Sequence, residues 1–566
     1  MRPARIIPAP MERGPTLSRF GHLCLFGAIF ALYLFSTSGA RPWGDATPVW
    51  EVADSIVHAH SLHATTRWPM NLPNGKDGHL YGLAPLLQSL VHVPGAALQR
   101  YVASVRPAYW QITWRLTCHL APTFLGTLAC LLFFRLCRRV GIELLPAGLT
   151  TLALAFASSV WVYARYPYSE TLQMCCFTGF FHCLLDVRDR PTWRTAIGLG
   201  VWAGLLVNAK PVFVVSGFGA GLFLIWELRR DWRALVRVAV VSSAAAAPLA
   251  ALYLWYNYVR WGSYTFTGYG VAISTSGIAG PSIHENALVG LWGMFLSPGK
   301  SIFLYSPPLL VALFGFLRFA KSHRQVVLAM ALTIVPGLLI HAQMISWAGD
   351  YAWGARYTIF ALGVFLLPAG CVVEACLKQA HQLRRWLGIT ALTSVLLGGA
   401  AVTYLGNAIY WDHFIRIQSE ATRFWLGTPN NKGDGSSTQA IPCPVCFETI
   451  SQLQWLPPFQ HIVGNYWLLT HLPYGHDWVR AEQDAPWRRY TNLQINIQES
   501  YARASVDWWF LEYRRTFPTL CWFLVIFLPS VSATLLVLFL WQVVRAGRRA
   551  RQLLVEKTEV SLAEAT

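Results

Sequence analysis

The chain has 566 residues, of which 54% are hydrophobic and 13% are charged, against about 25% charged residues in an ordinary soluble domain. This composition excludes a soluble globular domain and indicates an integral membrane protein. The formal net charge of +18 would favour nucleic-acid binding in a soluble protein, but here the basic residues follow the membrane topology, so we expect no nucleic-acid partner.

Twelve largely apolar runs have about the length that a helix needs to cross a bilayer. In chain order they lie near 20–40, 113–135, 145–164, 168–186, 194–209, 211–228, 236–256, 301–318, 325–345, 357–376, 386–408 and 518–543. The fifth and sixth form one long run that Asn208-Ala209-Lys210-Pro211 divides. The sequence therefore predicts an all-α polytopic membrane protein with about twelve transmembrane helices.

Arginine and lysine residues cluster in alternate connections between these runs. With the amino terminus inside, all clusters fall on one side: Arg135/Arg138/Arg139, Arg188/Arg190/Arg194, Arg229/Arg230/Arg233/Arg237, Arg318/Lys321/Arg324, Lys378/Arg384/Arg385 and Arg545/Arg548/Arg549/Arg551. The positive-inside rule makes that side cytoplasmic. We expect a multi-pass protein of the plasma (inner) membrane, with both termini in the cytoplasm and attraction to anionic membrane lipids.

This topology leaves two long outer segments, 41–112 and 409–516. They divide the chain into a transmembrane module, 1–408, an extracytoplasmic segment, 409–516, and a final transmembrane helix with a basic cytoplasmic tail, 517–566. The remaining connections are short, apart from the one after the seventh run.

The first outer segment is predicted to carry two helices that lie on the membrane. Thr47-Pro48 is typical of an N-cap followed by a proline at the first helical position, and the residues after it form an amphipathic pattern. The stretch from Leu83 to Leu98 is too short to span and contains Pro94, which predicts a second interfacial or re-entrant helix. Between them, the glycine-rich run from Pro73 to Tyr81 is a loop suited to carrying ligands.

The second outer segment is rich in aromatic residues, which favours ordered structure. Its tryptophans either anchor surface helices in the headgroup layer or stack on sugar rings: Trp411, Trp425, Trp455, Trp467, Trp478, Trp508 and Trp509. Cys443 and Cys446 form a single CxxC motif, for which a local disulfide and half of a zinc site are the alternatives. Most other cysteines fall in predicted spans and are expected to pack as small apolar residues.

Isolated polar and ionisable residues gather at the outer ends of the predicted spans. Such groups are costly near the membrane, so a functional role or tight pairing is expected. The candidates are Asp45, Arg165, Tyr168, Glu170, Lys210, Arg260, Asp350 and Arg356. Structural roles are open as well: a helix cap for Asp45, ion pairs for Glu170 with Arg165 and for Asp350 with Arg356, and a snorkelling side chain for Lys210.

Carboxylates beside cations at an apolar boundary suit the transfer of a group from a phosphate-bearing lipid to a hydroxyl. The cations stabilise the departing phosphate, and a carboxylate removes the proton of the acceptor. The sequence contains no Walker loop and no dinucleotide fingerprint. An activated lipid is therefore expected to supply the energy.

With these polar residues at the outer ends of its spans, the chain resembles the GT-C superfamily of polytopic glycosyltransferases. Within that superfamily it resembles the bacterial relatives of protein O-mannosyltransferases and lipid A aminoarabinose transferases. The resemblance covers most of residues 15–410 and rests on Gly44-Asp45, Tyr166 to Glu170, Tyr256 to Gly262, Ser297 to Pro308 and Trp347 to Tyr357. It implies a GT-C-like catalytic module, a polyprenyl-phosphate sugar donor and inverting transfer to a lipid, glycan or protein hydroxyl on the outer face.

The resemblance also implies roles for the candidate residues. Asp45 matches the catalytic acid of the first outer loop, and Glu170 corresponds by position to a second acid that orients the acceptor or holds a cation. The candidates for binding the lipid phosphate are Arg356, Lys210 and either Arg165 or Arg260, while Tyr168 and Asp350 complete the substrate-binding set. Because Ala46 stands where the mannosyltransferases have the second of two paired acids, the use of a divalent cation is open; no other cofactor is expected.

Two other functions are open. A transporter or flippase for a lipid-linked sugar would also place polar groups along a cavity, but the sequence shows no internal repeat of spans with matched broken helices. A transporter also needs ionisable groups near mid-membrane, whereas here the best ones lie at the outer ends. The second alternative is a member of the same fold that has lost catalysis and serves as an assembly partner.

Overall fold

The structure, a computed structural model, describes residues 16–39, 44–66, 72–268, 286–344, 346–349, 352–409, 414, 451–471, 478–489 and 506–565. Of the residues singled out above, Asp350, Trp411, Trp425, Cys443 and Cys446 lie outside these ranges. The described residues form helices and no strand, with two isolated β-bridges, Asn74–Leu80 and Ile409–Val506.

The helices follow the apolar runs of the sequence, and each of the twelve runs coincides with one helix or with two consecutive ones. The described helices are α1 (Arg19–Phe35), α2 (Ala46–His58), α3 (Leu86–Leu90), α4 (Val93–Val105), η1 (Pro107–Tyr109), α5 (Trp110–Thr117), α6 (Leu120–Arg139), α7 (Leu144–Phe156), α8 (Ser159–Tyr163), α9 (Glu170–Asp189), α10 (Trp193–Ala209), η2 (Pro211–Phe213), α11 (Val214–Leu228), α12 (Trp232–Trp261), α14 (Ala287–Leu296), α15 (Ile302–Tyr305), α16 (Pro308–Ser322), α17 (Arg324–Ala342), η3 (Arg356–Ala361), α18 (Leu362–Leu377), α19 (Gln382–Ala408), η4 (Pro457–Phe459), α22 (His461–His471), α23 (Trp478–Gln483), η6 (Pro486–Arg489), α25 (Trp509–Tyr513) and α26 (Pro518–Ala565).

Among the described residues, seven helical stretches are long and apolar enough to cross a membrane. They are Ile112–Arg139, Pro211–Leu228, Trp232–Trp261, Arg324–Ala342, Arg356–Leu377, Gln382–Ala408 and Pro518–Arg549, and α1, α7 and α14 are shorter apolar helices. The structure confirms an all-α, multi-pass membrane protein. Seven helices meet this criterion where about twelve spans were predicted.

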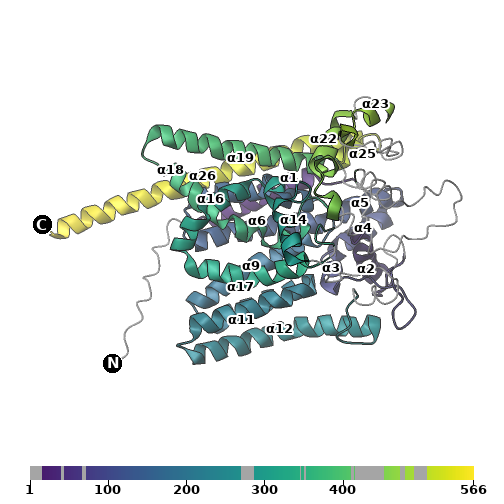
Figure 1. Ribbon diagram of the computed structural model, residues 1–566, viewed down its shortest axis with the longest axis horizontal. Coiled ribbons are helices and arrows are strands. Elements are labelled where there is room, and N and C mark those ends of the chain that lie inside the picture. The colour runs from purple at the N-terminus through teal and green to yellow at the C-terminus, as the bar shows by residue number, and fades with distance from the viewer. Residues whose placement is uncertain are drawn as a thin grey trace.

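The long helices lie side by side along one axis of the molecule (Figure 1). The short helices α2 to α5 gather at one end of this bundle, toward which α22, α23 and α25 also lie, whereas the C-terminal end of α26 lies at the opposite end (Figure 1). The bundle interior is one apolar core, in which Phe133, Phe177 and Leu367 are fully buried. The described parts of the two long outer segments thus share one end of the bundle.

The first outer segment is helical at both predicted places, with two differences. Helix α2 begins at Ala46 rather than at Pro48, and it buries Val49, Val52 and Ala53 as the amphipathic pattern predicts. The second stretch forms two helices, α3 and α4, because Pro94 lies in the first turn of α4, where its missing amide hydrogen costs no bond.

The first outer segment is docked on the bundle rather than free of it. Gln88 of α3 donates a hydrogen bond of 2.7 Å to the carbonyl of Ala209 at the end of α10. This bond brings the outer segment next to the turn that holds Lys210.

The described part of the second outer segment has a small core of its own, which contains Phe414, Phe459, Trp467, Leu468 and Trp487. For Trp467 and Trp509, both predicted alternatives, anchoring in the headgroup layer and stacking on a sugar, are wrong. Their side chains are buried in the protein, so they neither anchor in lipid nor stack on a sugar. The division of the chain after 408 and 516 stays a prediction.

Candidate functional site

A pocket opens where the first outer segment meets the ends of several long helices. It is lined by Asp45, Pro48, Val49, Leu72, Leu83, Ala84, Gln88, Pro167, Tyr168, Ser169, Glu170, Lys210 and Arg356. Five of the eight predicted site residues therefore come together: Asp45, Tyr168, Glu170, Lys210 and Arg356. Helix ends bring them there, because Asp45 directly precedes α2, Glu170 begins α9, Lys210 directly follows α10 and Arg356 begins η3.

The guanidinium of Arg356 joins the two predicted catalytic carboxylates. Its Nη2 lies 3.0 Å from Oδ2 of Asp45, and its Nε lies 3.3 Å from Oε1 of Glu170. The alternative of an ion pair between Glu170 and Arg165 is therefore wrong, since Arg356 takes that place. The alternative that Asp45 only caps a helix is also wrong, because its side chain makes no capping hydrogen bond.

The two carboxylates differ in their surroundings. The side chain of Asp45 is 48% exposed, whereas that of Glu170 is 4% exposed. Oε2 of Glu170 is buried and has no hydrogen-bond partner among the described residues. A buried acceptor without a donor is costly, so this oxygen is suited to receive a hydroxyl group from a ligand.

Two cations meet around the ring of Tyr357, beside the carboxylates. Nζ of Lys210 lies 4.5 Å from the ring centroid, and Cζ of Arg356 lies 5.5 Å from it. The imidazole of His341 stacks on the same ring, with the two centroids 4.5 Å apart. Two converging cations suit an anionic group such as a phosphate. Tyr357, His341 and Gln88 were not among the predicted site residues. For Tyr357, its position directly after Arg356 was the available signal.

Arg165, a predicted phosphate ligand, lies elsewhere. Its buried guanidinium donates hydrogen bonds to the carbonyls of Ser36, Asn407 and Asp507 and lies 3.4 Å from the Asp507 carboxylate. Burial raises the pKa of the Asp507 carboxyl, although Arg165 opposes that rise. The hydroxyls of Tyr166 (2.6 Å) and Ser38 (2.7 Å) also donate hydrogen bonds to this carboxylate. Arg165 therefore joins the end of α1, the end of α19 and the chain before α25.

We expect Asp507→Asn to lower the free energy of unfolding by about 1–3 kcal/mol, because it leaves buried donors of Arg165 and Tyr166 imperfectly paired. The midpoint of unfolding in detergent measures this loss. Asp484→Asn is the matched control, since that side chain is 56% exposed and should change stability by less than about 0.5 kcal/mol. Equal midpoints for the two variants would show that the buried network is not needed for stability.

Arg260, the second candidate alongside Arg165 for binding the lipid phosphate, also has its hydrogen-bond partners within the protein. Its side chain is buried and donates hydrogen bonds to the carbonyls of Gly82 (2.6 Å) and Ala84 (3.0 Å), and to Oδ1 of Asn257 (2.7 Å). Because Ala84 lines the pocket, Arg260 is a positioning residue that holds the pocket wall. Isolated arginines at outer helix ends look alike in the sequence, and only their partners separate Arg165 and Arg260 from Arg356.

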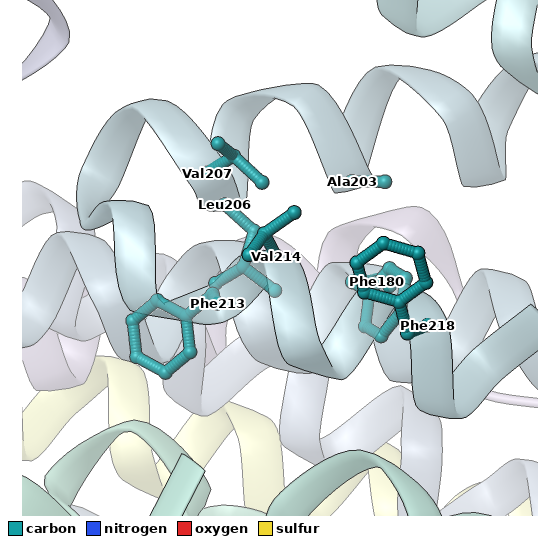
Figure 2. A pocket seen from close by; sticks show the side chains of 8 residues that line it. Phe180, Ala203, Leu206, Val207, Phe213, Val214 and Phe218 are labelled. Carbon is teal, nitrogen blue, oxygen red and sulfur yellow. The ribbon is translucent and has the colours of Figure 1, made fainter. Parts of the chain in front are cut away.

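An apolar cavity of about 250 Å³ lies between α9, α10 and α11 (Figure 2). It is lined by Phe180, Ala203, Leu206, Val207, Phe213, Val214, Gly217 and Phe218. Val214 and Phe218 are 46% and 70% exposed, so the cavity opens to the outside of the bundle. Val207 precedes Lys210 by about one helical turn, which places this apolar surface close to a cation of the pocket.

No family model matches the sequence, and no curated protein matches it. One similar solved structure is the archaeal oligosaccharyltransferase AglB from Archaeoglobus fulgidus, in complex with an inhibitory peptide and a dolichol-phosphate. It is 13% identical to this chain, with a TM-score of 0.44. The match covers 72% of this chain and 58% of AglB, which is less than two thirds of the length of AglB. ArnT from Cupriavidus metallidurans bound to undecaprenyl phosphate is 12% identical with a TM-score of 0.46, covering 86% of this chain and 85% of ArnT. The apo state of ArnT is 14% identical with a TM-score of 0.39, covering 88% of each chain. Both proteins are of the GT-C kind that the sequence resembles, but likenesses this low assign no activity, donor or acceptor to this chain.

Proposed function

We propose that the chain is a membrane glycosyltransferase that moves a sugar from a polyprenyl-phosphate donor to a hydroxyl acceptor. The observation that carries this proposal is the pocket, in which Asp45, Glu170, Lys210 and Arg356 meet at helix ends. A base for the acceptor and cations for the leaving phosphate are the two groups that this reaction needs.

Asp45 is the proposed general base. Arg356 holds its Oδ2, which leaves Oδ1 to accept the proton of the acceptor hydroxyl. The acceptor oxygen forms a bond to the anomeric carbon while the bond from that carbon to the phosphate oxygen breaks, so the configuration inverts. The electron pair leaves with the polyprenyl phosphate, whose charge Lys210 and Arg356 stabilise.

Glu170 and Tyr168 are proposed to position the substrates. Glu170 fixes Arg356 from its buried side and offers Oε2 to a sugar or acceptor hydroxyl. The hydroxyl of Tyr168 lies 3.9 Å from where a Cβ of Gly44 would be, and Gly44 has a φ of +59°, which favours glycine. This close approach gives the sugar an aromatic wall directly beside Asp45.

The apolar cavity of Figure 2 is proposed to take the first isoprene units of the donor. Its opening toward the outside of the bundle would admit a lipid chain from the membrane. Lys210, about one turn beyond Val207, would then meet the phosphate at the head of that chain. This arrangement separates the apolar and anionic parts of one ligand along α10.

We further propose that the pocket lies on the outer face of the plasma (inner) membrane, with both termini in the cytoplasm. Helices α9 and α10 support this orientation, because Glu170 and Lys210 lie at their pocket ends while Arg188 and Arg194 lie at their other ends. The two carboxylates converge on the guanidinium of Arg356, which brings positive charge to the place where a divalent cation would bind. No step of the proposed reaction therefore uses a metal ion.

The proposed activity is tested with the purified chain in nanodiscs, given a synthetic polyprenyl-phosphate sugar and envelope extract as the source of acceptors. Mass spectrometry should show polyprenyl phosphate and a glycosylated acceptor formed together. In vesicles, movement of intact donor between leaflets without conversion would contradict the proposal and favour a transporter. Neither conversion nor movement would favour a member of the fold without catalysis.

Gly349→Ala is expected to slow this conversion at least tenfold. Gly349 has a φ of +68°, and a Cβ at this position would lie 2.5 Å from Cγ of Arg356, so alanine displaces the side chain that joins both carboxylates. The rate of donor conversion in nanodiscs measures the effect. Gly398→Ala, where a Cβ meets nothing within 4 Å, is the control; equal rates for the two variants would show that the placement of Arg356 is unimportant.

A further inference from the structure

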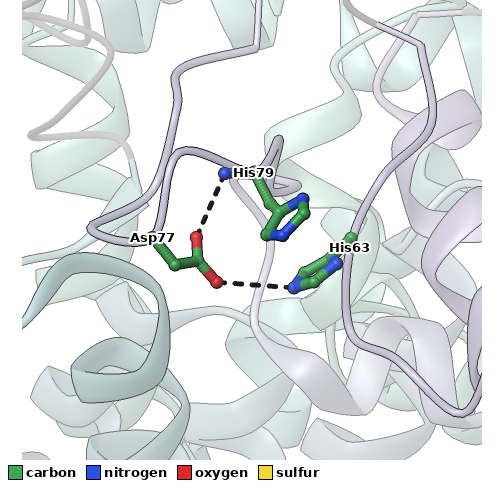
Figure 3. A group of neighbouring side chains, drawn as sticks. All are labelled: His63, Asp77 and His79. Carbon is green, nitrogen blue, oxygen red and sulfur yellow. Dashed lines mark hydrogen bonds and ion pairs between the residues drawn. The ribbon is translucent and has the colours of Figure 1, made fainter.

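A second cluster of ionisable side chains lies in the first outer segment, and none of its members lines the pocket. It contains His63, which follows α2, and Asp77 and His79, which belong to the turn 74–80 (Figure 3). Nε2 of His63 lies 3.5 Å from Oδ2 of Asp77, and the rings of His63 and His79 stack with centroids 4.0 Å apart. One nitrogen or oxygen atom from each residue lies within 4.8 Å of the others.

Backbone contacts hold together the two stretches of chain that carry these side chains. The bridge between Asn74 and Leu80 closes the turn. The amide of Ala64 donates to the carbonyl of Leu80 at 2.8 Å, which ties the chain around His63 to the same turn. The amide of Lys76 donates to the carbonyl of Arg260 at 2.8 Å, so the turn is anchored on the end of α12.

The carboxylate of the cluster is oriented by neighbouring donors. The hydroxyl of Tyr81, a buried side chain, donates to Oδ2 of Asp77 at 2.9 Å, and the amide of His79 donates to Oδ1 at 3.1 Å. Hydrogen bonds of this kind fix the ligands of metal ions in proteins. The cluster therefore has ligand groups together with a second layer that orients one of them.

We propose that His63, Asp77 and His79 bind a divalent transition-metal ion of the zinc class, with water at the remaining position. Two ligands of a tetrahedral zinc ion, each about 2.05 Å from the metal, lie about 3.4 Å apart, close to the distance between His63 and Asp77. Asp77 and His79 are exposed, so their side chains can close on an ion. Imidazole ligands favour zinc and its neighbours over magnesium and calcium.

The bound ion would join the stretch after α2 to the turn 74–80. Leu72, two residues before this turn, forms part of the pocket wall. The ion would thus hold the turn beside the pocket wall in place. The metal site does not depend on the proposed glycosyltransferase activity, because it shares no residue with the pocket.

The test is zinc binding by the full chain in nanodiscs after treatment with a chelator. Equilibrium dialysis should show one tightly bound Zn²⁺ per chain, and Co²⁺ should give the visible absorption of a four- or five-coordinate site. The double variant His63→Gln and His79→Gln should bind Zn²⁺ at least 100-fold more weakly. Tyr81→Phe should weaken binding about 10- to 100-fold, as the loss of a second-layer hydrogen bond does.

His60→Gln is the matched control, because His60 is an exposed histidine of the same segment outside the cluster and should bind zinc like the wild type. The unfolding midpoints of all variants in chelator, compared with the wild type, show whether each one folds. Absence of zinc from the wild type would overturn the proposal. Equal zinc binding by the wild type and by the folded double variant would also overturn it.

Discussion

Replacement of Asp45 by asparagine is expected to lower sugar transfer by about 10²- to 10⁴-fold, the usual contribution of a general base. Asparagine keeps the shape of the side chain and an oxygen for Arg356, but it cannot accept the proton of the acceptor hydroxyl. Donor binding should therefore change little, so that kcat falls and the KM for the donor stays close to that of the wild type. Initial rates at several donor concentrations in nanodiscs measure both quantities.

The control for this variant is Asp54→Asn, in the same surface helix. Asp54 belongs to α2 and does not line the pocket, so its replacement should leave the transfer rate close to that of the wild type. Full activity of a folded Asp45→Asn variant would contradict the role of Asp45. A loss confined to KM would mean that Asp45 binds substrate rather than removing a proton.

Replacement of Arg356 by lysine is expected to lower transfer by about 10²- to 10³-fold, the usual effect of removing one charge-stabilising donor. A lysine ammonium is a point charge and cannot bridge Asp45 and Glu170 with the planar fork of a guanidinium. Donor turnover at saturating concentration measures this loss. Arg106→Lys, an exposed arginine of the first outer segment, is the control and should leave turnover unchanged.

A double variant separates catalysis from stability at Arg356. Arg356→Gln alone leaves the buried carboxylate of Glu170 without its cation, which should cost about 3–5 kcal/mol of stability. Adding Glu170→Gln removes that buried charge, so the double variant should recover most of the stability but not the transfer activity. Recovery of transfer at the wild-type rate would contradict a direct role for both residues.

The course of the helices could be predicted from the sequence because membrane-length apolar runs have few other ways to satisfy their backbone. Each of the twelve predicted runs is helical in the structure. The local errors have local causes: Pro94 starts a new helix within the second surface stretch, and α2 extends two residues before Pro48.

The members of the pocket could be predicted, but not their pairing. Asp45, Glu170, Lys210 and Arg356 stand out in the sequence as isolated polar residues at helix ends, and the structure brings all four together. Arg165 gives the same signal, yet its carboxylate partner is Asp507, 342 residues away in the chain. No local pattern marks such a pairing, because it depends on how the last outer segment packs against α1 and α19.

The cluster of His63, Asp77 and His79 could likewise be predicted only in part from the sequence. The loop from Pro73 to Tyr81 could be recognised as one that carries ligands, but the third ligand, His63, lies outside it. A hydrogen bond between Ala64 and Leu80 joins the two stretches. Single backbone contacts of this kind cannot be inferred from glycine and proline content.

The most direct test of the proposed site is an experimental structure of the chain in nanodiscs with added polyprenyl phosphate. The phosphate should lie within hydrogen-bond distance of Lys210 and Arg356, with the first isoprene units in the cavity beside Phe213 and Phe218. A phosphate bound at any other part of the molecule, with the pocket around Asp45 and Glu170 left without lipid, would contradict the proposed function.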